Sequence, residues 1–555
     1  MSLGALLVDR GVLSHEQLAL AQSEQASSGE GLPRVLARLG LVRQTDLLAL
    51  LGEQFALPVV SLVGREADRE ALASLPAKLV FRHGCAPIER RRGVLTVATS
   101  DPFDLAAIEE LRAVTGCPIR VALADEEELR EFVREHYGVG GDTLDELSAG
   151  LAQDSESVSV AEDGIEAAQE ASVIRLVNDL LIEAITERAT DVHIEPYEKE
   201  LAVRYRIDGV LLRAKVPPTI SRFANAIVSR LKIMSNLNVA EKRLPQDGRI
   251  TLRHKGQEFD LRVSVIPMLF GEGVVLRVLS KTAALMSLDD LGMPAGVLER
   301  WDALIGRPHG ILLVTGPTGS GKSTTLYASL NRIVSDEIKA ITVEDPVEYH
   351  VPGVNQIQVS HKVGLDFSAG LRAILRHDPD VVMIGEIRDK ETAETAVQAS
   401  LTGHLVFSTL HTNDAAGSTT RLLDMGVEPF LVASSVEGIL AQRLVRRVCR
   451  TCAAEHIPDS GDLPPGLQLP PGGALVRGAG CRDCRETGYR GRVGIYELLR
   501  MNDNVRELVM HRANATQIAA ASLRDGELTL LRHDGFAKAL AKVTTIEEVV
   551  RATAT

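Results

Sequence analysis

The alternation of hydrophobic and polar residues changes character several times along the chain, which predicts several domains. Apolar positions in 3–54 form a repeat at a constant offset of 29 residues, and each unit is predicted to form a short helix, a glycine-containing turn and an amphipathic helix. Residues 55–137 alternate strand-like runs, such as 94–98, with helical patterns, such as 126–136. We therefore predict an N-terminal domain, 1–137, with a helical part and a small α/β part.

The following segment, 138–172, contains nine acidic residues but no Lys or Arg. With Gly and Ser interspersed, this composition predicts a flexible acidic linker, and a charged tail that recruits partners is the alternative. Dense patterning resumes in 173–284, where a helix at 173–190 precedes strand-like runs and the hairpin signal Asp208–Gly209. That segment predicts an α+β domain with an antiparallel sheet.

In the last predicted domain, 285–555, an apolar strand at 310–315 runs into a glycine-rich loop and a helix. The loop fits the pattern G-x-x-x-x-G-K-[ST] in full, in the strand–loop–helix context that the pattern requires. Backbone N–H groups of such a loop bind phosphates, Lys322 places a charge near the β and γ phosphates, and the Ser323 hydroxyl is placed to ligate Mg²⁺. The predicted ATP-binding residues are Gly316, Pro317, Thr318, Gly319, Ser320, Gly321, Lys322, Ser323 and Thr324.

Hydrolysis also needs a group that positions the attacking water. Residues 380–384 have the pattern of another buried strand, and Glu386 follows its end. An acidic residue at the carboxyl end of a neighbouring strand faces the γ-phosphate, so we predict that Glu386 orients or deprotonates the water. A third strand end carries Glu344, Asp345 and Glu348. Glu344 is our candidate from this group for a catalytic role through Mg²⁺, with a solvated loop acid as the alternative.

Two histidines bracket a fourth predicted strand within 402–412. His411 follows the strand and is a candidate sensor of the γ-phosphate across the sheet. For His404, which precedes the strand, a structural role and a functional role are equally open, because a lone histidine is more often structural.

Four arginines are candidates for neutralising charge in the transition state. Arg372 and Arg376 lie four apart on a predicted helix, 369–377, and so share a face. Arg262 and Arg277 lie on predicted strands of the preceding domain, and such arginines can act as fingers if subunits form a ring. For both pairs, ordinary salt bridges with carboxylates are the alternative.

The six cysteines include two C-x-x-C pairs. Cys449 with Cys452 and Cys481 with Cys484 are separated by 28 proline-rich residues. Paired knuckles of this kind match a tetrahedral zinc site, which would hold together the insertion 445–490. A dithiol redox role is the alternative.

Composition and charge argue against several other classes of protein. The 555 residues carry a net charge of −14 and only 3% are aromatic, which argues against a protein that binds nucleic acid. No apolar run approaches the roughly 20 residues that span a bilayer, and the first residues lack the pattern of a secretory signal. The few cysteines suit a reducing compartment. We therefore expect an intracellular protein.

Together these motifs resemble the secretion (traffic) ATPase superfamily, and the resemblance covers residues 170–555. The tetracysteine insertion and the long N-terminal region are similar to the general secretion pathway protein E family of type II secretion ATPases and to pilus-extension ATPases. Residues 187–191 favour the secretion family. The resemblance rests on the P-loop, 343–346, 371–380 with 385–389, 402–411, 189–196 and 246–249.

This resemblance implies a multidomain α/β P-loop NTPase with a RecA-like core, preceded by a PAS-like α+β domain and an N-terminal docking domain. It implies a homohexamer attached peripherally to the cytoplasmic face of the inner membrane, with ATP between the nucleotide domain of one subunit and the preceding domain of another. ATP, Mg²⁺ and Zn²⁺ are the implied cofactors. It also supports the four arginines as γ-phosphate contacts, Glu386 as the acid that activates water, and the four cysteines as a zinc site.

The implied partners are the cytoplasmic domain of an inner-membrane type II secretion assembly protein, on which the N-terminal domain docks, and an inner-membrane platform protein. Hydrolysis would drive a pseudopilus that exports folded proteins. In some relatives the N-terminal repeat binds cyclic di-guanylate through an Arg before Leu-Gly in each unit. Here Ser2 and Gly31 stand in those places and Pro33 replaces the second Gly, so the sequence favours a docking scaffold without that ligand.

Three other functions are alternatives to type II secretion. A type IV pilus-extension ATPase shares nearly all of the motifs. A nucleic-acid motor also uses P-loop rings, but the acidic charge and scarce aromatics argue against it. A nucleotide sensor without hydrolysis is disfavoured because Lys322, Ser323 and Glu386 are all present.

Overall fold

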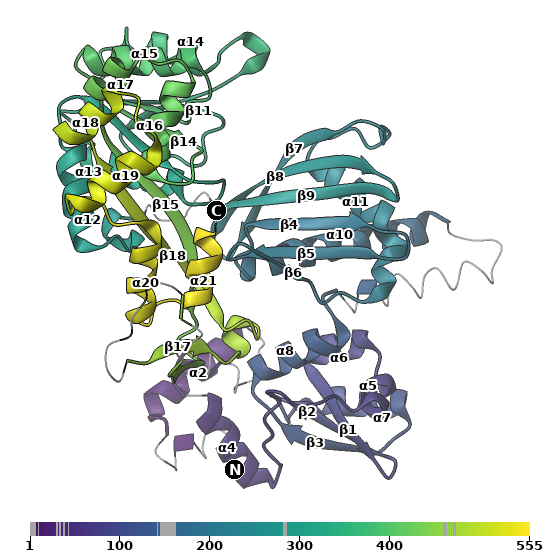
Figure 1. The fold of residues 1–555 in the computed structure, drawn as a ribbon. Coiled ribbons are helices and arrows are strands. Elements are labelled where there is room, and N and C mark those ends of the chain that lie inside the picture. Colours follow the sequence, from purple (N-terminus) through teal and green to yellow (C-terminus); the bar gives the residue numbers. More distant parts are fainter. Residues whose placement is uncertain are drawn as a thin grey trace. The chain divides into compact units, whose positions relative to one another are not determined.

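The chain divides into two compact units in the computed structural model (Figure 1). Unit 1 comprises 1–254 with 260–278, and unit 2 comprises 255–259 with 279–555. Unit 1 therefore contains both segments that the sequence analysis separated by an acidic linker. The structure describes residues 7–8, 10, 12–28, 32, 35–36, 39–42, 44–140, 143–144, 162–280, 286–458, 463–464, 467, 469 and 473–554.

The N-terminal part of unit 1 has a helical portion and a small α/β portion. Ser14 caps α2, because its Oγ accepts from Gln17 N at 3.1 Å while Gln17 Oε1 accepts from Ser14 N at 2.9 Å. In the α/β portion, β1 and β2 are antiparallel, and β2 and β3 are parallel. The elements are α2 (His15–Ser28), α4 (Gln44–Phe55), α5 (Arg69–Ser74), α6 (Ala77–His83), β1 (Cys85–Arg91), β2 (Val94–Thr99), α7 (Leu105–Thr115), β3 (Ile119–Leu123) and α8 (Glu126–Tyr137).

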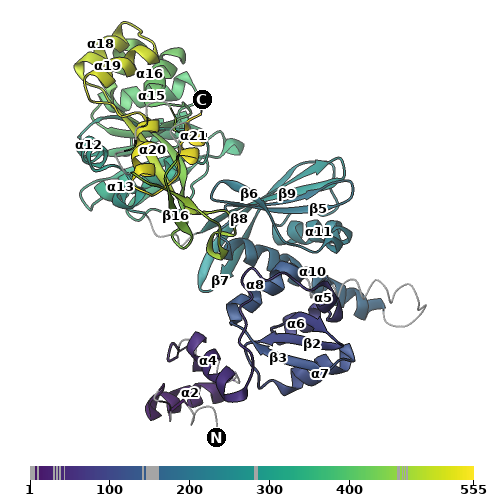
Figure 2. The same ribbon diagram turned by 60° about the horizontal axis from the view of Figure 1, so that its bottom comes forward.

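The rest of unit 1 is a six-stranded sheet in the order β6-β5-β4-β9-β8-β7, with α10 and α11 lying together along it (Figure 2). The strands whose pairing is resolved are antiparallel, as the hairpin signal predicts. The elements are α10 (Glu162–Thr186), β4 (Asp191–Pro196), β5 (Leu201–Ile207), β6 (Val210–Arg213), a 3-10 helix (Pro218–Phe223), α11 (Ala224–Met234), β7 (Gln246–His254), β8 (Gln257–Met268) and β9 (Gly271–Ser280).

Helix α10 differs from its predicted bounds of 173–190. It begins at Glu162, inside the segment assigned to the acidic linker, and ends at Thr186. Acidic residues near a helix N-terminus are favourable there, so the charges that indicated a linker are also compatible with a helix start. Strand β7 had no predicted counterpart. Ile250 is its single buried residue, so the sequence lacks the alternation of apolar and polar residues that indicates a strand.

Unit 2 is built on a seven-stranded sheet in the order β12-β11-β13-β14-β10-β15-β18, in which only the β15–β18 pair is antiparallel. The strands are β10 (Gly310–Thr315), β11 (Ala340–Glu344), β12 (Val354–Gln358), β13 (Val381–Ile384), β14 (Leu405–Leu410), β15 (Val436–Val448) and β18 (Tyr489–Arg500), with a separate hairpin of β16 (Ala453–His456) and β17 (Leu475–Gly478). The helices are α12 (Ala295–Ile305), α13 (Lys322–Ile333), α14 (Phe367–Ile374), α15 (Lys390–Leu401), α16 (Ala415–Asp424), α17 (Pro429–Ser435), α18 (Asp503–Met510), α19 (Ala515–Arg524), α20 (Leu531–Leu540) and α21 (Ile546–Thr553).

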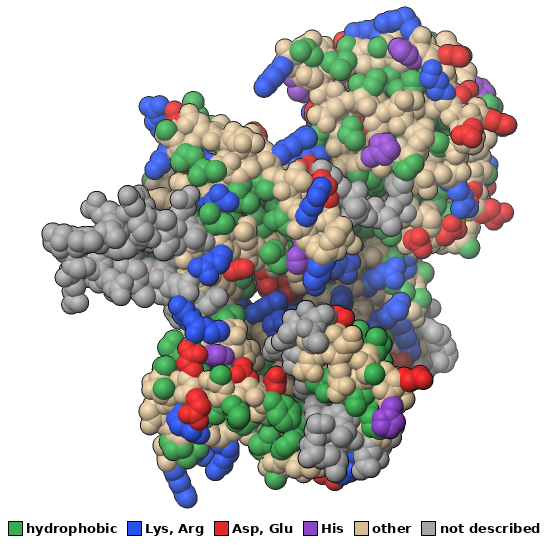
Figure 3. Space-filling model, turned by 180° about the vertical axis from the view of Figure 1, so that it is seen from behind, with side chains coloured by type: hydrophobic (Ala, Val, Ile, Leu, Met, Phe, Trp, Pro, Cys, Tyr) green, Lys and Arg blue, Asp and Glu red, His purple; other side chains and the backbone are tan. Residues whose placement is uncertain are grey.

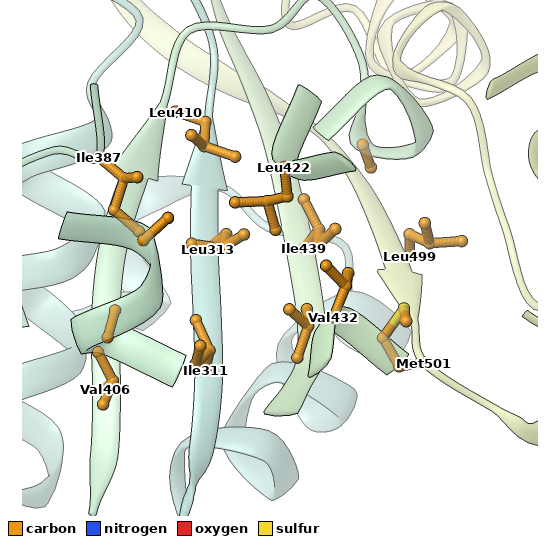
Figure 4. Packing of buried hydrophobic residues seen from close by; sticks show 14 of the residues in the cluster. Ile311, Leu313, Ile387, Val406, Leu410, Leu422, Val432, Ile439, Leu499 and Met501 are labelled. Atoms are coloured by element: carbon orange, nitrogen blue, oxygen red, sulfur yellow. The ribbon is translucent and has the colours of Figure 1, made fainter. Parts of the chain in front are cut away.

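Helices cover both faces of this sheet, which explains why its central strands are continuous apolar runs. In β10, Ile311 and Leu313 pack into one buried cluster with residues of α15, α16 and α17 (Figure 4). Leu312 and Val314 point to the other face and pack with residues of α12 and α13. All six residues of β10 are buried. The predicted α/β class is therefore confirmed, and the two cores hold the carboxyl ends of the parallel strands in fixed positions.

Charged side chains of both signs are interspersed on the face of the molecule seen in Figure 3, with hydrophobic side chains between them. Neither sign dominates the described surface on that face. Among the helices of the described segments, none combines the length and apolar character that crossing a bilayer requires.

Candidate functional site

The glycine-rich loop lies at the carboxyl end of β10, between the parallel neighbours β14 and β15. Gly321 has φ +88, and a Cβ there would lie 2.8 Å from Nε2 of Gln442. A Cβ at Gly316 would lie 2.5 Å from the carbonyl oxygen of Gln442. Both positions therefore require glycine, and the loop is closely packed on β15. The N-terminus of α13 follows the loop, which is the arrangement that binds phosphate oxygens.

Lys322, the first residue of α13, is held over the loop. Its Nζ donates to the carbonyl oxygens of Gly316 at 2.8 Å and Pro317 at 3.1 Å. Burial lowers the pKa of Lys322 overall, although the nearby Glu386 carboxylate opposes this effect. A phosphate would give the half-buried ammonium a charged partner in place of two neutral carbonyl oxygens. The loop and its lysine therefore fit a triphosphate, and the exposed Ser323 beside them offers a hydroxyl for Mg²⁺.

Glu386 follows β13, which only β14 separates from β10. Its side chain is 15% exposed. Oε2 lies 3.0 Å from Nε2 of His411, and Oε1 accepts a hydrogen bond from the guanidinium of Arg388. Burial raises the pKa of Glu386, but the hydrogen bonds and charges of Arg388 and His411 outweigh burial and lower it overall. The carboxylate is therefore ionised at neutral pH, as an acceptor of a water proton must be.

His411 follows β14, which pairs in parallel with both β13 and β10, so its side chain can reach Glu386 after the end of β13. Oγ1 of Thr412 lies 2.7 Å from Oγ1 of Thr315, and Thr412 N donates to the same oxygen at 3.0 Å. These bonds join the end of β14 to the end of β10, directly before the P-loop. His404 lies at the opposite end of β14, where its Nδ1 is 2.9 Å from the carbonyl oxygen of Ala399. The structure thus places His411, and not His404, at the carboxyl edge of the sheet.

Glu344, the last residue of β11, is only 4% exposed. Its carboxylate accepts from the hydroxyl of Tyr327, from Thr342 Oγ1 at 2.5 Å and from Gln356 Nε2 at 3.1 Å. Burial raises the pKa of Tyr327 and the charge of Glu344 raises it further, so the phenol stays protonated and donates. Three neutral donors thus hold Glu344 as part of the core. Its catalytic role through Mg²⁺ stays a prediction.

Arg372 lies on α14, which ends at Ile374, three residues before its predicted end, so Arg376 follows the helix. Nη1 of Arg376 donates to the carbonyl oxygen of Arg372 at 2.9 Å. Arg372 donates to Ser368 Oγ at 2.5 Å and pairs with Glu391. Exposed ion pairs of this kind contribute little to stability, so Arg372 can change partners at small cost. Phosphate binding by either arginine stays a prediction.

Arg262 and Arg277 lie on the neighbouring strands β8 and β9 of unit 1. Nε of Arg277 donates to Oδ1 of Asp191 at 3.2 Å, and the two residues stand directly opposite each other in the β9–β4 pair. Arg262 lies between the buried Leu261 and Val263, and strand alternation places it on the other face of β8. The structure thus shows an ion pair for Arg277, and a catalytic role for either arginine stays a prediction.

Gln442 and Arg443 had no predicted role, but they join β15 to the phosphate-binding edge. Oε1 of the buried Gln442 accepts from Oγ1 of Thr325 in α13 at 2.6 Å. Nη2 of Arg443 donates to the carbonyl oxygen and to Oδ1 of Asn413 at 2.9 and 3.2 Å. Burial lowers the pKa of Arg443. In the sequence, the polar pair Gln442 and Arg443 interrupts an otherwise apolar strand, and this interruption could have indicated a functional role.

Arg388 also had no predicted role, although it lies in the segment 385–389 on which the resemblance rests. Its position two residues after Glu386 was the available signal. The structure shows that this spacing lets the guanidinium turn back onto the carboxylate.

The four predicted zinc ligands converge at the end of the ribbon that β15 and β18 form. Cys449 follows β15 directly, and Cys481 and Cys484 precede β18. The four Sγ atoms lie within 4.8 Å of one another, and three of the pairs are 3.7 Å apart. A tetrahedral zinc ion with thiolates at about 2.3 Å places its sulfur ligands about 3.8 Å apart. The cluster therefore fits Zn²⁺.

Backbone donors complete this cluster. The N–H groups of Cys481 and Gly488 both donate to Sγ of Cys484 at 3.2 Å. Such outer contacts orient metal ligands. All four thiols converge instead of forming two isolated dithiols, which favours a metal over the redox alternative. No other group of three or more His, Cys, Asp or Glu side chains converges in this way in the part of the chain that the structure describes.

Residues 166–551 match the family described as Type II/IV secretion system protein. The chain belongs to this family. The match spans unit 2 and the six-stranded part of unit 1. Residues 55–143, a range that includes the small α/β portion, match a second family described as the MshEN domain.

Full-length relatives support the same assignment. The chain is 43% identical to the Type IV pilus assembly ATPase PilB of Myxococcus xanthus, over 100% of this chain and 99% of the relative. It is 43% identical to Type II secretion system protein E of Xanthomonas campestris pv. campestris, over 99% of this chain and 97% of the relative. The fold is similar to that of the Legionella pneumophila ATPase DotB, with a TM-score of 0.51 and 20% identity over 68% of this chain and 94% of that one.

Family membership confirms several of the predictions. The chain is an ATP hydrolase of the secretion ATPases, with a P-loop fold. ATP and Mg²⁺ are its cofactors, and the cysteine cluster fits Zn²⁺.

Proposed function

We propose that the chain hydrolyses ATP at the carboxyl edge of the unit 2 sheet and uses Glu386 to position the attacking water. The placement of the Glu386 carboxylate is the observation that carries this proposal. It contacts His411 at 3.0 Å and is close enough to Lys322 to shift the pKa of the ammonium. Glu386 thus combines ionisation, orientation and proximity to the phosphate-binding loop.

Each of these residues has a distinct task in the proposed reaction. The loop N–H groups and Lys322 bind the β and γ phosphates, and Ser323 would hold Mg²⁺, which neutralises phosphate charge when bound. Glu386 accepts a hydrogen bond from the water and takes its proton as the water oxygen bonds to the γ-phosphorus. The bond from that phosphorus to the bridging oxygen breaks, and ADP leaves with the oxygen. His411 fixes the carboxylate and lies where it can respond to the γ-phosphate.

We also propose that the protein works as a homohexamer in which a neighbouring subunit supplies Arg262 and Arg277. The exposure of Arg277, 55% for its side chain, supports this arrangement, because its pairing with Asp191 is accessible to a competing phosphate. The pair Arg372 and Arg376 would add charge from the same domain as the P-loop. Positive side chains around the γ-phosphate offset the charge that develops in the transition state.

The biological output that we propose is assembly of a pseudopilus and export of folded proteins by type II secretion. The name Type II secretion system protein E recurs among further curated relatives at 45–48% identity. Residues 187–191 support the same choice. Extension of a type IV pilus is the alternative, and the full-length similarity to PilB favours it.

The partners and location follow from this proposal. The N-terminal part would dock on the cytoplasmic domain of an inner-membrane assembly protein, near an inner-membrane platform protein, at the cytoplasmic face of that membrane. We propose this docking without cyclic di-guanylate. The positions that motivate that choice, Ser2, Gly31 and Pro33, lie outside the described residues.

Deletion of the gene, followed by complementation, tests the biological output. We expect the deletion to stop export of folded proteins across the outer membrane and to leave surface pili in place. The wild-type gene should restore export, whereas Lys322→Ala, produced at the same level, should not. Loss of pili with normal export would instead assign the protein to pilus extension, and loss of neither would contradict a secretion role.

A further inference from the structure

Both oxygens of the Glu386 carboxylate have protein partners, and the two partners come from different elements. His411 approaches Oε2 from the end of β14, and Arg388 approaches Oε1 from the loop that follows β13. The two members of the second pair differ in exposure, because the Arg388 side chain is 64% exposed and that of Glu386 is 15% exposed. The ion pair therefore joins the long, solvent-exposed side chain of Arg388 to the largely buried carboxylate of Glu386.

Other charged groups face this pair. Lys322 approaches the carboxylate from the P-loop, and its charge interacts with that of Glu386. The hydrogen bond with Glu386 raises the pKa of the Arg388 guanidinium most, and the charge of Asp345, the residue after β11, raises it further. Glu386 thus interacts with Lys322, His411 and Arg388, and Arg388 interacts with two carboxylates.

ATP changes the electrostatics around Glu386. The γ-phosphate places negative charge beside Lys322. Lys322 then pairs with the phosphate and stabilises the ionised form of Glu386 less than before. A like charge nearby favours protonation of a carboxylate and repels it. A protonated or displaced Glu386 cannot accept the proton of the attacking water. Catalysis therefore requires a positive group that stays with Glu386 while the phosphate is bound.

We infer that Arg388 is a positioning residue that holds the Glu386 carboxylate toward the attacking water and offsets the charge of the γ-phosphate. The inference rests on the role proposed above for Glu386. Each carboxylate oxygen has two lone-pair directions, so Glu386 can accept from Arg388, His411 and a water at the same time. Arg388 acts through Glu386 and not through its own contact with nucleotide.

A double-mutant cycle tests this dependence. Arg388→Ala should lower kcat by about 10- to 100-fold, the range for groups that orient a reacting residue, with KM for ATP nearly unchanged. In a Glu386→Gln background the same substitution should have no further effect, because the group through which Arg388 acts is absent. Lys390→Ala removes an exposed cation two residues away, which pairs with Glu394, and should leave kcat unchanged.

The pH dependence of kcat adds a readout that a purely structural role would not move. Arg388 lowers the pKa of Glu386, and the ionised carboxylate is the active form. Arg388→Ala should therefore shift the acidic limb of the profile to higher pH, so the loss of rate is larger at low pH. Arg388→Lys keeps the positive charge but lacks the planar guanidinium. It should return the acidic limb of the kcat profile toward its wild-type pH and restore part of the rate.

Several outcomes would overturn the inference. Equal losses in the wild-type and Glu386→Gln backgrounds would show that Arg388 acts independently on the phosphate, as would a raised KM. An unchanged rate would show an ordinary surface ion pair, and a raised rate would show that Arg388 restrains the enzyme. Normal turnover by Glu386→Gln alone would contradict the proposed role of Glu386 itself, and the inference about Arg388 would fall with it.

Discussion

Strand β15 connects two ligand sites that are built in opposite ways. Gln442 and Arg443 border the P-loop, and Cys449 begins the cysteine cluster six residues after Arg443. At the phosphate-binding edge, side chains such as Lys322 and Glu386 are partly exposed and hold partners that a substrate can replace. At the cysteine end the thiols converge on one another and on backbone N–H groups.

This difference separates a site that exists before its ligand from a site that depends on its ligand. The phosphate-binding edge rests on a sheet buried on both faces, so its geometry does not require ATP. In the cysteine module, β16 is exposed along its whole length, whereas Leu467 and Leu475 pack on buried residues of α20 and α21. Bound metal is therefore a structural ligand that stabilises the module together with this small hydrophobic cluster, whereas bound nucleotide is the substrate of the edge.

Removal of zinc should have the largest effect and should leave the phosphate-binding edge intact. Structural zinc contributes roughly 10–16 kcal/mol of apparent binding free energy in small zinc domains. We expect one zinc per chain, lost in Cys449→Ser and Cys481→Ser, together with new protease cuts in 445–490. Elemental analysis and limited proteolysis measure both. Cys117→Ser, a buried cysteine outside the cluster, is the control and should retain the metal.

Fluorescence distinguishes local from global loss of structure in the zinc variants. Trp301 is the only tryptophan of the chain and is fully buried, and its Nε1 donates to Ser329 Oγ of α13 at 3.0 Å. Its emission should not change when zinc is lost. A red-shifted emission would show that the two sites are not independent, and equal zinc in all variants would remove the metal assignment.

Substitution of Arg262 and Arg277 tests whether ATP hydrolysis at the phosphate-binding edge of unit 2 also needs side chains of unit 1. Arginine fingers contribute roughly 10³–10⁵ to the rate of comparable reactions. Arg262→Ala and Arg277→Ala should therefore nearly abolish turnover while sparing most ATP affinity. Arg213→Ala, on the same sheet and paired with Glu200, is the control and should retain activity. Phosphate release and nucleotide titration measure the two quantities.

Mixing experiments ask whether these arginines act between subunits. Combining Arg277→Ala with Glu386→Gln protein should restore some activity, because a few interfaces would pair an intact Arg277 with an intact Glu386. Specific activity of the wild type should also rise with protein concentration as rings form. No rescue, together with activity independent of concentration, would leave the ion pair with Asp191 as the role of Arg277.

A smaller effect is expected where β15 supports the P-loop helix. Gln442→Ala leaves the buried Thr325 hydroxyl without its acceptor, which costs about 1–3 kcal/mol. Urea unfolding followed through Trp301 should show this loss, and Ser434→Ala, at an exposed hydroxyl of α17, should not. Adding Thr325→Val to Gln442→Ala should cost less than the sum of the two changes. Stability equal to wild type would contradict the support that we assign to β15.

Local motifs made most of the chemistry predictable from the sequence. The P-loop, the strand that ends at Glu386 and the cysteine spacing each depend on neighbours in the chain, and the structure places all of them in the expected elements. The start of α10 was not predictable, because the acidic composition that indicates a linker also suits a helix N-terminus. Strand β7 was hidden because only Ile250 in it is buried.

Contacts between distant residues were beyond the sequence. Nothing near Glu344 shows that Tyr327 and Gln356 will surround its carboxylate, because those partners come from α13 and β12. The contacts of Gln442 and Arg443 with the P-loop helix and the turn after β14 arise only when β15 pairs with β10. Tertiary packing, and not local pattern, decides which polar groups in the interior become part of the site.

Glu386→Gln tests the central claim most directly, because it separates nucleotide binding from hydrolysis at one edge of the sheet. The P-loop and Lys322 are unchanged in this variant, so we predict nearly normal ATP affinity. Turnover should fall by about 10²–10⁴-fold, the contribution of a positioned base. Lys322→Ala, measured alongside, should lose tight binding as well as rate. Turnover by Glu386→Gln within about twofold of the wild-type rate, far from the loss expected for a base, would contradict the account.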